Sequence, residues 1–381
     1  MSQNIFIKNL NYRKGNEEFY KQNLEEEAKI NGGKCYMKIL KKANRLNRGD
    51  KIALVSLSWG GAGDANLLWR YKQGKKRLEQ DFGLEVVEMK HTLAGTEYIY
   101  NHPEKRAEDL MNAFSDNSIK AIIACIGGIE SIRMLPYIDF DIIGNNPKIF
   151  MGYSDTTTTH LFCYKAGISS IYGPTLLVDF AENVSMSQYT VEHIEKTLFK
   201  SEIIGAIEPS SDWTSEFLAW EEENKLIQRK FNPNNGYELL QGKGIAKGRL
   251  IGGCFEVFDS LRGTEVFPEL EDFDDSILFL ETSEEKPPAW LIECSLRTYG
   301  INGILDRIKG IIWGKPQDET YYEEYKVVIK KVMIEFGKEN LPILYNMNFG
   351  HTEPKICLPY GALAEINCDK LSFSILESAV L

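Results

Sequence analysis

Short apolar runs alternate with helical patterns along the first half of the chain. The runs are almost free of polar residues, which is typical of parallel strands buried on both faces. Between them, apolar residues recur every three to four positions, the period of an amphipathic helix. This alternation predicts βαβ units and an α/β domain built on a parallel sheet. The predicted strands are residues 52–57, 84–89, 120–126, 148–153 and 168–173, with helices at residues 66–80, 103–115, 130–135 and 156–166.

A second unit of strands and helices begins at residue 241. Its last two strands flank Cys368 and Asp369 and alternate apolar with polar residues, which predicts a terminal hairpin. The pattern fits either an α/β or an α+β domain. The predicted strands are residues 246–252, 276–281, 308–314, 342–346, 362–367 and 370–376, with helices at residues 256–261, 289–298 and 321–336.

Two stretches fall outside these patterns. Residues 1–36 are mostly polar and charged, and residues 205–240 combine prolines and asparagines with an acidic run. The second stretch has turn chemistry, so it is a linker or an active-site loop. Its tryptophans, Trp213 and Trp220, either anchor it by packing, the commoner role, or form a platform for a ligand. The predicted organisation is an extension (1–36), a first domain (37–204), a linker with a tryptophan-bearing loop (205–240) and a second domain (241–381).

The composition describes a folded protein of two domains. The 381 residues are 43% hydrophobic and 26% charged, with a formal net charge of −11. This hydrophobic content excludes disorder as the main state, and the negative charge disfavours binding to a nucleic-acid backbone. No apolar stretch reaches the ~20 residues of a membrane span, and residues 1–20 lack the apolar core of a secretory leader. The sequence predicts neither nucleic-acid nor membrane partners.

Cysteine and histidine usage bears on location and on metal binding. The seven cysteines are scattered and form no CxxC pair, which predicts reduced structural thiols in a cytoplasmic protein. The five histidines form neither an HxxxH nor an HExxH pattern, so no metal site is expected.

A serine directly follows the predicted strand 148–153. Ser154 and Asp155 lie where this strand passes into a helix, at the sheet edge where ligands bind in open α/β folds. Such a turn can present a nucleophile and aim backbone N–H groups at an oxyanion. Alternatively, Ser154 or Asp155 caps the helix, a frequent role of both residue types. Gly127 and Gly128, after the neighbouring strand, are either anion-binding backbone or a plain turn.

Two further side chains suit acid–base chemistry. His351 follows Gly350 in a loop, where an imidazole acts as a general base or lies at the surface without a role. Glu281 ends an apolar strand, where its carboxylate orients an imidazole or is simply solvated. Together with Ser154, these residues supply a nucleophile, an acid and a base in the order Ser, Glu, His.

Several segments resemble the LD-carboxypeptidase family of serine peptidases. The resemblance runs from about residue 37 to the end, in the family's order. It implies a Rossmann-like parallel-sheet amino-terminal domain, a carboxyl-terminal α/β domain with a mixed sheet, an active site between them, and a homodimer. The segments are CIGGIES (125–131), MGYSDTT (151–157), LIGGCFEVFDSLRGT (250–264), ILFLE (277–281) and NFGHTEPKICLPYGALAEIN (348–367).

The resemblance also assigns roles by position. It implies that Ser154 is the nucleophile, His351 the base and Glu281 its partner. The implied oxyanion hole is the N–H groups of Gly128 and Asp155, with Gly127 beside the substrate. It implies a small-molecule or short-peptide substrate and neither a metal nor an organic cofactor.

The loop SSDWTSEFLAWEEE favours the branch of microcin C immunity peptidases, described as MccF-like. Members of this branch carry a tryptophan here that stacks on the base of an aminoacyl-nucleotide; Trp220 is the expected residue and Trp213 the second choice. Such stacking contributes ~1–3 kcal/mol. The alternatives are a muropeptide LD-carboxypeptidase that removes terminal D-alanine, and a two-domain small-molecule sensor without catalysis. Two features depart from the family pattern: Thr282 follows Glu281, and residues 1–36 lie outside it.

Overall fold

A parallel sheet organises the first half of the chain in the computed structural model, which describes residues 38–381. Its strands are β1 (Lys51–Val55), β2 (Glu85–Glu88), β3 (Ile119–Ala124), β4 (Ile149–Gly152), β5 (Ile171–Tyr172) and β14 (Leu358–Pro359). Their order is β14-β5-β4-β3-β1-β2, and all pairs are parallel except β14 with β5. The predicted α/β fold with a parallel sheet is confirmed. The predicted extension at residues 1–36 lies outside the described residues.

Helices cover this sheet in the way the apolar runs predict. All four residues of β4 are buried. Because successive side chains of a strand point to opposite faces, continuous burial requires cover on both faces. Three helices pack on the strands: α2 (Leu68–Gln80) on β2, α4 (Pro103–Ser115) on β1 and β3, and α6 (Thr157–Lys165) on β5. Pro103 is the first residue of α4, where its missing N–H leaves no hydrogen bond unmade.

Several short elements of the first domain were not predicted. The segment at residues 130–135, expected as a helix, is a 3-10 helix, η2, that contains Pro136. The helices missed by the sequence patterns are α3 (Thr96–Asn101), α5 (Phe140–Asn145) and α7 (Gln188–Leu198). Short helical segments complete the domain: the 3-10 helices η1 (Gly61–Gly63), η2 (Ser131–Tyr137) and η3 (Ser154–Thr156), and the π-helix η4 (Leu176–Phe180).

A second sheet organises the carboxyl-terminal half and is mixed. Its strands are β6 (Gly205–Ile207), β9 (Glu238–Gln241), β10 (Ile245–Cys254), β11 (Ser276–Glu281), β12 (Gly310–Gly314), β13 (Ile343–Met347), β15 (Leu363–Asn367) and β16 (Ser372–Ile375). The order is β6-β16-β15-β10-β11-β12-β13-β9. The four strands from β10 to β13 are parallel and the outer ones antiparallel. The predicted terminal hairpin is the β15–β16 pair.

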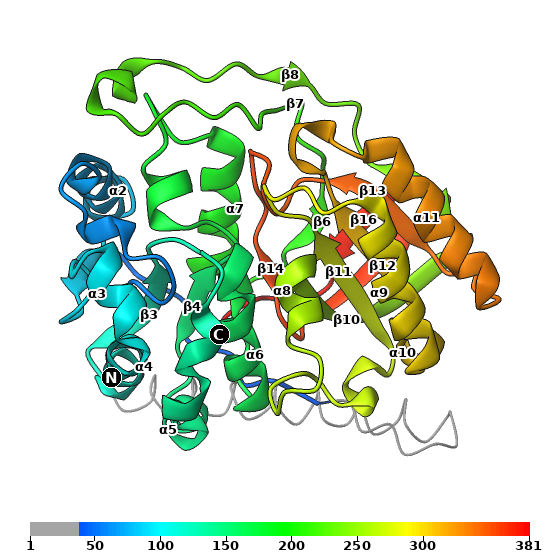
Figure 1. Ribbon diagram of the computed structural model, residues 1–381, viewed down its shortest axis with the longest axis horizontal. Helices are drawn as coiled ribbons and strands as arrows, with labels where there is room; N and C mark the ends of the chain where they lie inside the picture. Colours follow the sequence, from blue (N-terminus) through cyan, green and yellow to red (C-terminus); the bar gives the residue numbers. More distant parts are fainter. Residues whose placement is uncertain (1–37) are drawn as a thin grey trace, which may run out of the picture. The chain divides into compact units, whose positions relative to one another are not determined.

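Helices also pack on the second sheet. Figure 1 shows α9 and α11 side by side along it, and the two helices are in contact. Their apolar faces are buried around Tyr299 and Tyr325. The helical elements of this half are α8 (Phe255–Ser260), η6 (Leu270–Phe273), α9 (Ala289–Ile301), α10 (Ile304–Arg307), η7 (Gln317–Glu319) and α11 (Tyr322–Glu335).

The segment 205–240 belongs partly to the second sheet. Its two ends are the edge strands β6 and β9, on opposite sides of that sheet. Between them, β7 (Asp212–Trp213) pairs with β8 (Asn232–Pro233), and the 3-10 helix η5 (Glu222–Leu226) forms a turn. In Figure 1 this segment runs across the top of the view. The turn residues that the sequence shows here therefore lie between short strands.

Cysteine pairing and helix length can be read from the described residues. The six cysteines within residues 38–381 are all free, and all but Cys294 are buried. Among the helices of the described chain, none combines the length and the apolar character needed to cross a membrane.

Candidate active site

Ser154 lies on a sharp turn between β4 and α6. Its φ of 65° places it in the left-handed region, which costs a non-glycine residue ~1–3 kcal/mol and is common at functional sites. Neither η3 nor α6 receives a side-chain cap from its N-cap residue, and the Asp155 carboxylate bonds to a different helix. The helix-capping interpretation of Ser154 and Asp155 is therefore wrong for α6.

The three side chains expected to work together lie in one chain of hydrogen bonds. Nε2 of His351 is 3.0 Å from Oγ of Ser154, and Nδ1 of His351 is 2.7 Å from Oε2 of Glu281. Glu281 is 0% exposed and His351 is 9% exposed, so neither is a solvated surface group. The strand end at β11, the loop after β13 and the turn at η3 thus bring together residues from both sheets.

Gly350 allows the His351 loop to reach the carboxylate. Its φ is 96°, and a Cβ added there would lie 2.4 Å from Oε2 of Glu281. Since any side chain at this position would collide with the carboxylate, glycine is required for the close approach.

Tyr172, which the sequence analysis did not single out, joins the two halves of this site. Its hydroxyl donates to Oε1 of Glu281 at 2.5 Å and accepts the backbone N–H of Ser154 at 3.1 Å. Burial, with the neighbouring charge of Glu281, raises the pKa of Tyr172 well above its ordinary value, so the hydroxyl keeps its proton. The sequence offered one indication of this role: Tyr172 lies near the end of the predicted strand 168–173, which follows the predicted strand that leads to Ser154.

The glycine pair lies directly against the Ser154 turn. A Cβ on Gly127 would be 2.8 Å from Cβ of Ser154 and 3.2 Å from the backbone nitrogen of Asp155. Gly128 has φ 148°, and a Cβ there would lie 2.3 Å from Oγ of Ser58. Both positions exclude a side chain: Gly127 because of the Ser154 turn, and Gly128 because of Ser58.

Asp155 fixes this glycine loop from the other side. Its Oδ2 accepts the backbone N–H groups of Glu130 at 2.9 Å and Ser131 at 2.8 Å, at the start of η2. The Ser131 hydroxyl donates to the Asp155 carbonyl at 2.9 Å. Asp155 therefore ties the segment that follows Gly127 and Gly128 to the turn that carries Ser154.

A second carboxylate reaches the same imidazole. Oε2 of Glu284 lies 3.0 Å from Nε2 of His351, the nitrogen that also contacts Ser154. Burial lowers the pKa of His351, but the carboxylates of Glu281 and Glu284 outweigh burial and raise it to about 10. The hydrogen bond to His351 lowers the pKa of Glu284 to about 2. In this arrangement the imidazole lies between two carboxylates, which favour its protonated form.

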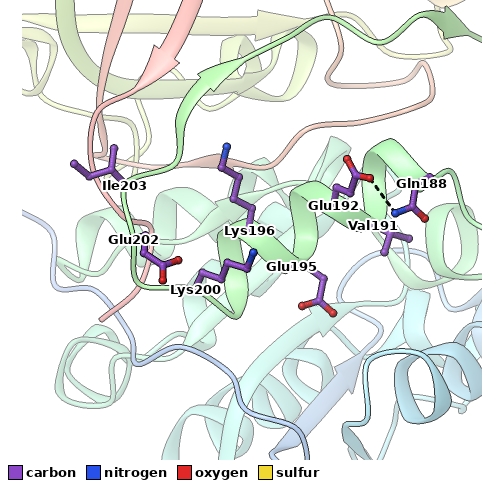
Figure 2. Close-up of a pocket in the computed structure, with 8 residues that line it drawn as sticks. All are labelled: Gln188, Val191, Glu192, Glu195, Lys196, Lys200, Glu202 and Ile203. Atoms are coloured by element: carbon purple, nitrogen blue, oxygen red, sulfur yellow. Dashed lines mark hydrogen bonds between the residues drawn. The ribbon is translucent and has the colours of Figure 1, made fainter.

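The site opens into a cavity of about 440 Å³. Both domains and the segment 205–240 line it. Besides Ser154, His351 and the two glycines, the lining includes Trp59, Arg70, Tyr153, Phe217, Trp220, Arg229, Glu284 and Glu353. A second hollow, shown in Figure 2, lies along α7 away from this chemistry and is lined by glutamate, lysine, glutamine and aliphatic side chains without a nucleophile.

The two tryptophans of the segment 205–240 occupy different environments. Trp220 lines the cavity; its ring centroid is 6.2 Å from that of Trp59, with the planes 22° apart, and the Arg70 guanidinium is 4.4 Å from its ring centre. Trp213 is 7% exposed, with Nζ of Lys315 at 4.0 Å from its ring centre. Packing thus accounts for Trp213, while Trp220 presents an aromatic surface to the cavity.

Buried charges fasten this segment to the loop that carries His351. Arg229 forms ion pairs with Glu182 and, at 3.0 Å, with Glu353. Nζ of Lys355 lies 2.6 Å from Glu353 and 2.9 Å from Asp179. Burial raises the pKa of Glu353, but Arg229 and Lys355 outweigh it and lower the pKa to about 2, so the carboxylate stays ionised. Two reciprocal backbone hydrogen bonds between Thr214 and Glu353 reinforce the connection.

One group of potential metal ligands lies within the described residues. The ligand atoms of Cys254, Glu281 and His351 all fall within 4.8 Å of one another. Burial raises the pKa of the Cys254 thiol well above its ordinary value, which disfavours the thiolate that binds a metal. The imidazole and the carboxylate of this group are already hydrogen-bonded to each other.

Known proteins resemble this chain over most of its length. Residues 52–173 match the LD-carboxypeptidase N-terminal domain, and residues 247–366 match the LD-carboxypeptidase C-terminal domain. YocD of Bacillus subtilis is 32% identical over 85% of this chain and 95% of its own. The microcin C7 self-immunity protein MccF of Escherichia coli is 30% identical over 81% and 88%. A Bacillus subtilis protein named for murein peptide carboxypeptidase activity is 27% identical over 79% and 85%.

Solved structures give the same picture. An MccF-like protein from Streptococcus pneumoniae, solved in complex with AMP, has a TM-score of 0.78 and 35% identity, covering 86% of this chain and 98% of its own. MccF in complex with aspartyl sulfamoyl adenosine has a TM-score of 0.78 and 28% identity, covering 90% and 100%.

Proposed function

This chain belongs to the LD-carboxypeptidase family of peptidases, and from that premise we propose that it is an MccF-like serine amidase. Its proposed substrate is an aminoacyl-nucleotide in which the acyl group bears a carboxylate. Cleavage of the amide that joins the two parts would serve detoxification or self-immunity. The observation that carries the proposal is the hydrogen-bonded series Ser154, His351 and Glu281, which opens into an aromatic-walled cavity.

In the proposed reaction, Ser154 is the nucleophile. Oγ attacks the amide carbonyl carbon, and Nε2 of a neutral His351 takes the hydroxyl proton. The same imidazole then gives the proton to the leaving nitrogen, which departs as the amide bond breaks. Glu281 holds Nδ1–H of the imidazole and stabilises the imidazolium. Water hydrolyses the acyl-enzyme by the same steps in reverse.

Backbone N–H groups are the proposed oxyanion hole. The donors are those of Gly128 and Asp155, on the two turns that meet at Ser154. The close approach of Gly127 to Ser154 and the hydrogen bonds that Asp155 accepts from the N–H groups of Glu130 and Ser131 support this assignment, because they tie the two turns together. Removing one such donor typically costs ~3–4 kcal/mol of transition-state stabilisation.

The walls of the cavity support a nucleotide rather than a cell-wall peptide. Trp59 and Trp220 line it with rings 22° from parallel, a surface suited to a planar base. Arg70 and Arg229 also line it and offer positive charge to an acidic acyl side chain or a phosphate. Two relatives are described in complexes with AMP and with aspartyl sulfamoyl adenosine.

A comparison of two substrates tests the proposal. Purified protein is incubated with aspartyl-sulfamoyl-adenosine or with an L,D-tetrapeptide of murein, and the products are separated by mass. Release of aspartate with negligible release of D-alanine is the expected result. Preferential release of D-alanine would instead establish the murein peptidase, the second candidate that the 27% identical Bacillus subtilis relative supports. A protein that cleaves neither and takes up no fluorophosphonate on Ser154 would be the non-enzymatic sensor.

A further inference from the structure

Glu284 contacts Nε2 of His351, the atom that must be free to accept the serine proton in the proposed reaction. General-base catalysis requires a neutral imidazole whose Nε2 accepts the proton of Ser154. Here Nε2 lies 3.0 Å from both Oγ of Ser154 and Oε2 of Glu284. A hydrogen on Nε2 that is shared with a carboxylate leaves no lone pair for the serine proton. The structure therefore shows a resting arrangement from which Glu284 must be drawn away.

The environment of Glu284 permits such a movement. Its side chain is 62% exposed, lines the cavity and stands on the loop after β11. The preceding residue is fixed: Oε1 of Glu256 accepts both the backbone N–H of Ser283, at 3.0 Å, and its hydroxyl, at 2.5 Å. The backbone is thus held while the carboxylate is free to exchange one cation for another.

We propose that Glu284 is a specificity-determining residue that binds the α-ammonium group of the aminoacyl substrate and thereby releases His351. This inference rests on the proposed function and deepens it. The substrate's cation replaces the imidazolium as the partner of Glu284. The Nε2 proton passes to water at the cavity mouth, and His351 becomes the neutral base next to Ser154. The enzyme is then active mainly when a substrate with a free amine is in place.

The geometry places Glu284 near the expected position of that amine. Oγ of Ser154 and Oε2 of Glu284 lie at the same distance from Nε2, so they are at most twice 3.0 Å apart. The α-nitrogen is two bonds from the carbonyl carbon that Ser154 attacks, and it is an ammonium only in an acyl group with a free amino terminus. In a murein tetrapeptide the corresponding nitrogen is an amide without charge. Glu284 therefore favours aminoacyl compounds over internal residues of a peptide.

Other charged and titratable groups lie around His351 and, in the proposed exchange, keep their present partners. They are Glu281 on β11 with the Tyr172 hydroxyl behind it, Cys254 at the end of β10, the Tyr153 ring at 5.0 Å, and the Glu353–Lys355 pair on the histidine's own loop. Of the carboxylates that contact the ring, Glu281 binds Nδ1 and is buried, whereas Glu284 binds Nε2 and is exposed. Of these two carboxylates, only Glu284 is accessible to an incoming ligand.

The decisive experiment compares a substrate with and without the ammonium group. We expect the full-length enzyme to cleave aspartyl-sulfamoyl-adenosine with a kcat/KM at least ~10-fold above that for its N-acetyl derivative at pH 7, because a charge-assisted contact is lost on acetylation. Glu284→Gln is expected to bring this ratio close to one. Glu285→Gln is the matched control, since Glu285 is exposed on the same loop and, in the described chain, lies outside the cavity lining; it should keep the wild-type ratio.

A substrate-independent measurement accompanies it. A fluorophosphonate carries no ammonium, so its rate of reaction with Ser154 reports the protonation of His351. For the wild type this rate should rise with pH, with a midpoint on the alkaline side, and Glu284→Gln should shift the midpoint to lower pH, which Glu285→Gln should not. The inference is overturned if Glu284→Gln leaves the midpoint unchanged, or if this variant prefers the free amine as strongly as the wild type does. In either case, hydrolysis of aspartyl-sulfamoyl-adenosine would still support the proposed function. If the wild-type enzyme reacts with fluorophosphonate but hydrolyses neither aspartyl-sulfamoyl-adenosine nor its N-acetyl derivative, both the inference and the proposed function are overturned.

Discussion

The hydroxyl of Tyr172 lies 2.5 Å from Oε1 of Glu281 and occupies the oxygen that His351 leaves free. The same hydroxyl accepts the backbone N–H of Ser154. A single side chain on β5 thus connects the turn of the first sheet with the carboxylate at the end of β11 in the second. Because the bond crosses between sheets, it fixes the distance between the serine and the acid as well as the orientation of the carboxylate.

Replacing Tyr172 with phenylalanine should weaken catalysis more than binding. A buried oxygen of Glu281 loses its partner, which costs ~1–3 kcal/mol of folding stability. A carboxylate that turns or shifts misplaces His351, and a displacement of about 1 Å can reduce turnover roughly 100-fold. We therefore expect kcat to fall roughly 10- to 100-fold, with little change in KM. Tyr164→Phe is the control, since its hydroxyl contacts Asp272 elsewhere in the fold and its loss should leave kcat unchanged.

Substitution Ser154→Ala should abolish most of the activity without unfolding the protein. Loss of the proposed nucleophile is expected to lower kcat by at least ~10³-fold. Circular dichroism and thermal melting should stay close to wild type, because alanine keeps the backbone of the turn. The exposed serine Ser260, changed to alanine, should have neither effect. Near-normal hydrolysis by Ser154→Ala would remove Ser154 from the mechanism.

Asp155→Ala tests whether the glycine loop is positioned by a carboxylate. The change leaves two backbone N–H groups, those of Glu130 and Ser131, without an acceptor. Asp139→Ala is a matched control, because Asp139 caps α5 through the N–H groups of Asp141 and Ile142 in the same manner. Both variants should lose ~1 kcal/mol of stability. Only Asp155→Ala should also lower kcat, and an equal activity in the two variants would contradict a role for Asp155 at the site.

Arg229→Ala should detach the segment 205–240 from the His351 loop. The substitution leaves the carboxylate of Glu182 without its cation and leaves Glu353 with Lys355 alone, and breaking a buried ion pair in this way typically costs ~3–5 kcal/mol. We expect a lower melting temperature and a higher KM for aspartyl-sulfamoyl-adenosine, since Trp220 is carried by the same segment. Lys230→Ala, at an exposed neighbour, should change neither quantity. A KM that stays constant in Arg229→Ala would show that the segment does not need this anchor to bind substrate.

The charge on His351 predicts a pH dependence of stability. Its pKa lies at about 10, above the ordinary 6.5, so its ion pairs stabilise the folded state fully below pH 6.5 and lose this effect as pH rises through about 10. Glu284→Gln removes one of these pairs. The difference in melting temperature between wild type and Glu284→Gln should therefore be larger at pH 6 than at about pH 10.5. Glu285→Gln should show no such trend, and a difference independent of pH would argue against the Glu284–His351 pair.

The central strands and the edge strand β2 could be predicted from the sequence, whereas the edge strands β6, β9 and β14 could not. Strands such as β1, β3, β4 and β11 are continuous apolar runs because helices cover both of their faces, and burial leaves a direct trace in residue type. β9 and β14 are short or partly polar and exist because they pair with β13 and β5 across the fold. When a strand forms only because it pairs with a distant strand, its own sequence need not show a strand pattern.

The residue types of the site can be found in the sequence: a serine and a glutamate at strand ends, a histidine after a glycine, and glycines where backbone must approach a side chain. Which of these groups meet follows from the packing of the two sheets. Ser154 and His351 are 197 positions apart, and Tyr172 and Glu281 are 109 apart. The tertiary structure also added Glu284, whose contact with His351 no spacing rule predicts. Residue type follows from local burial and turn geometry, but a contact between distant side chains depends on how two sheets close on each other, which no short stretch of sequence encodes.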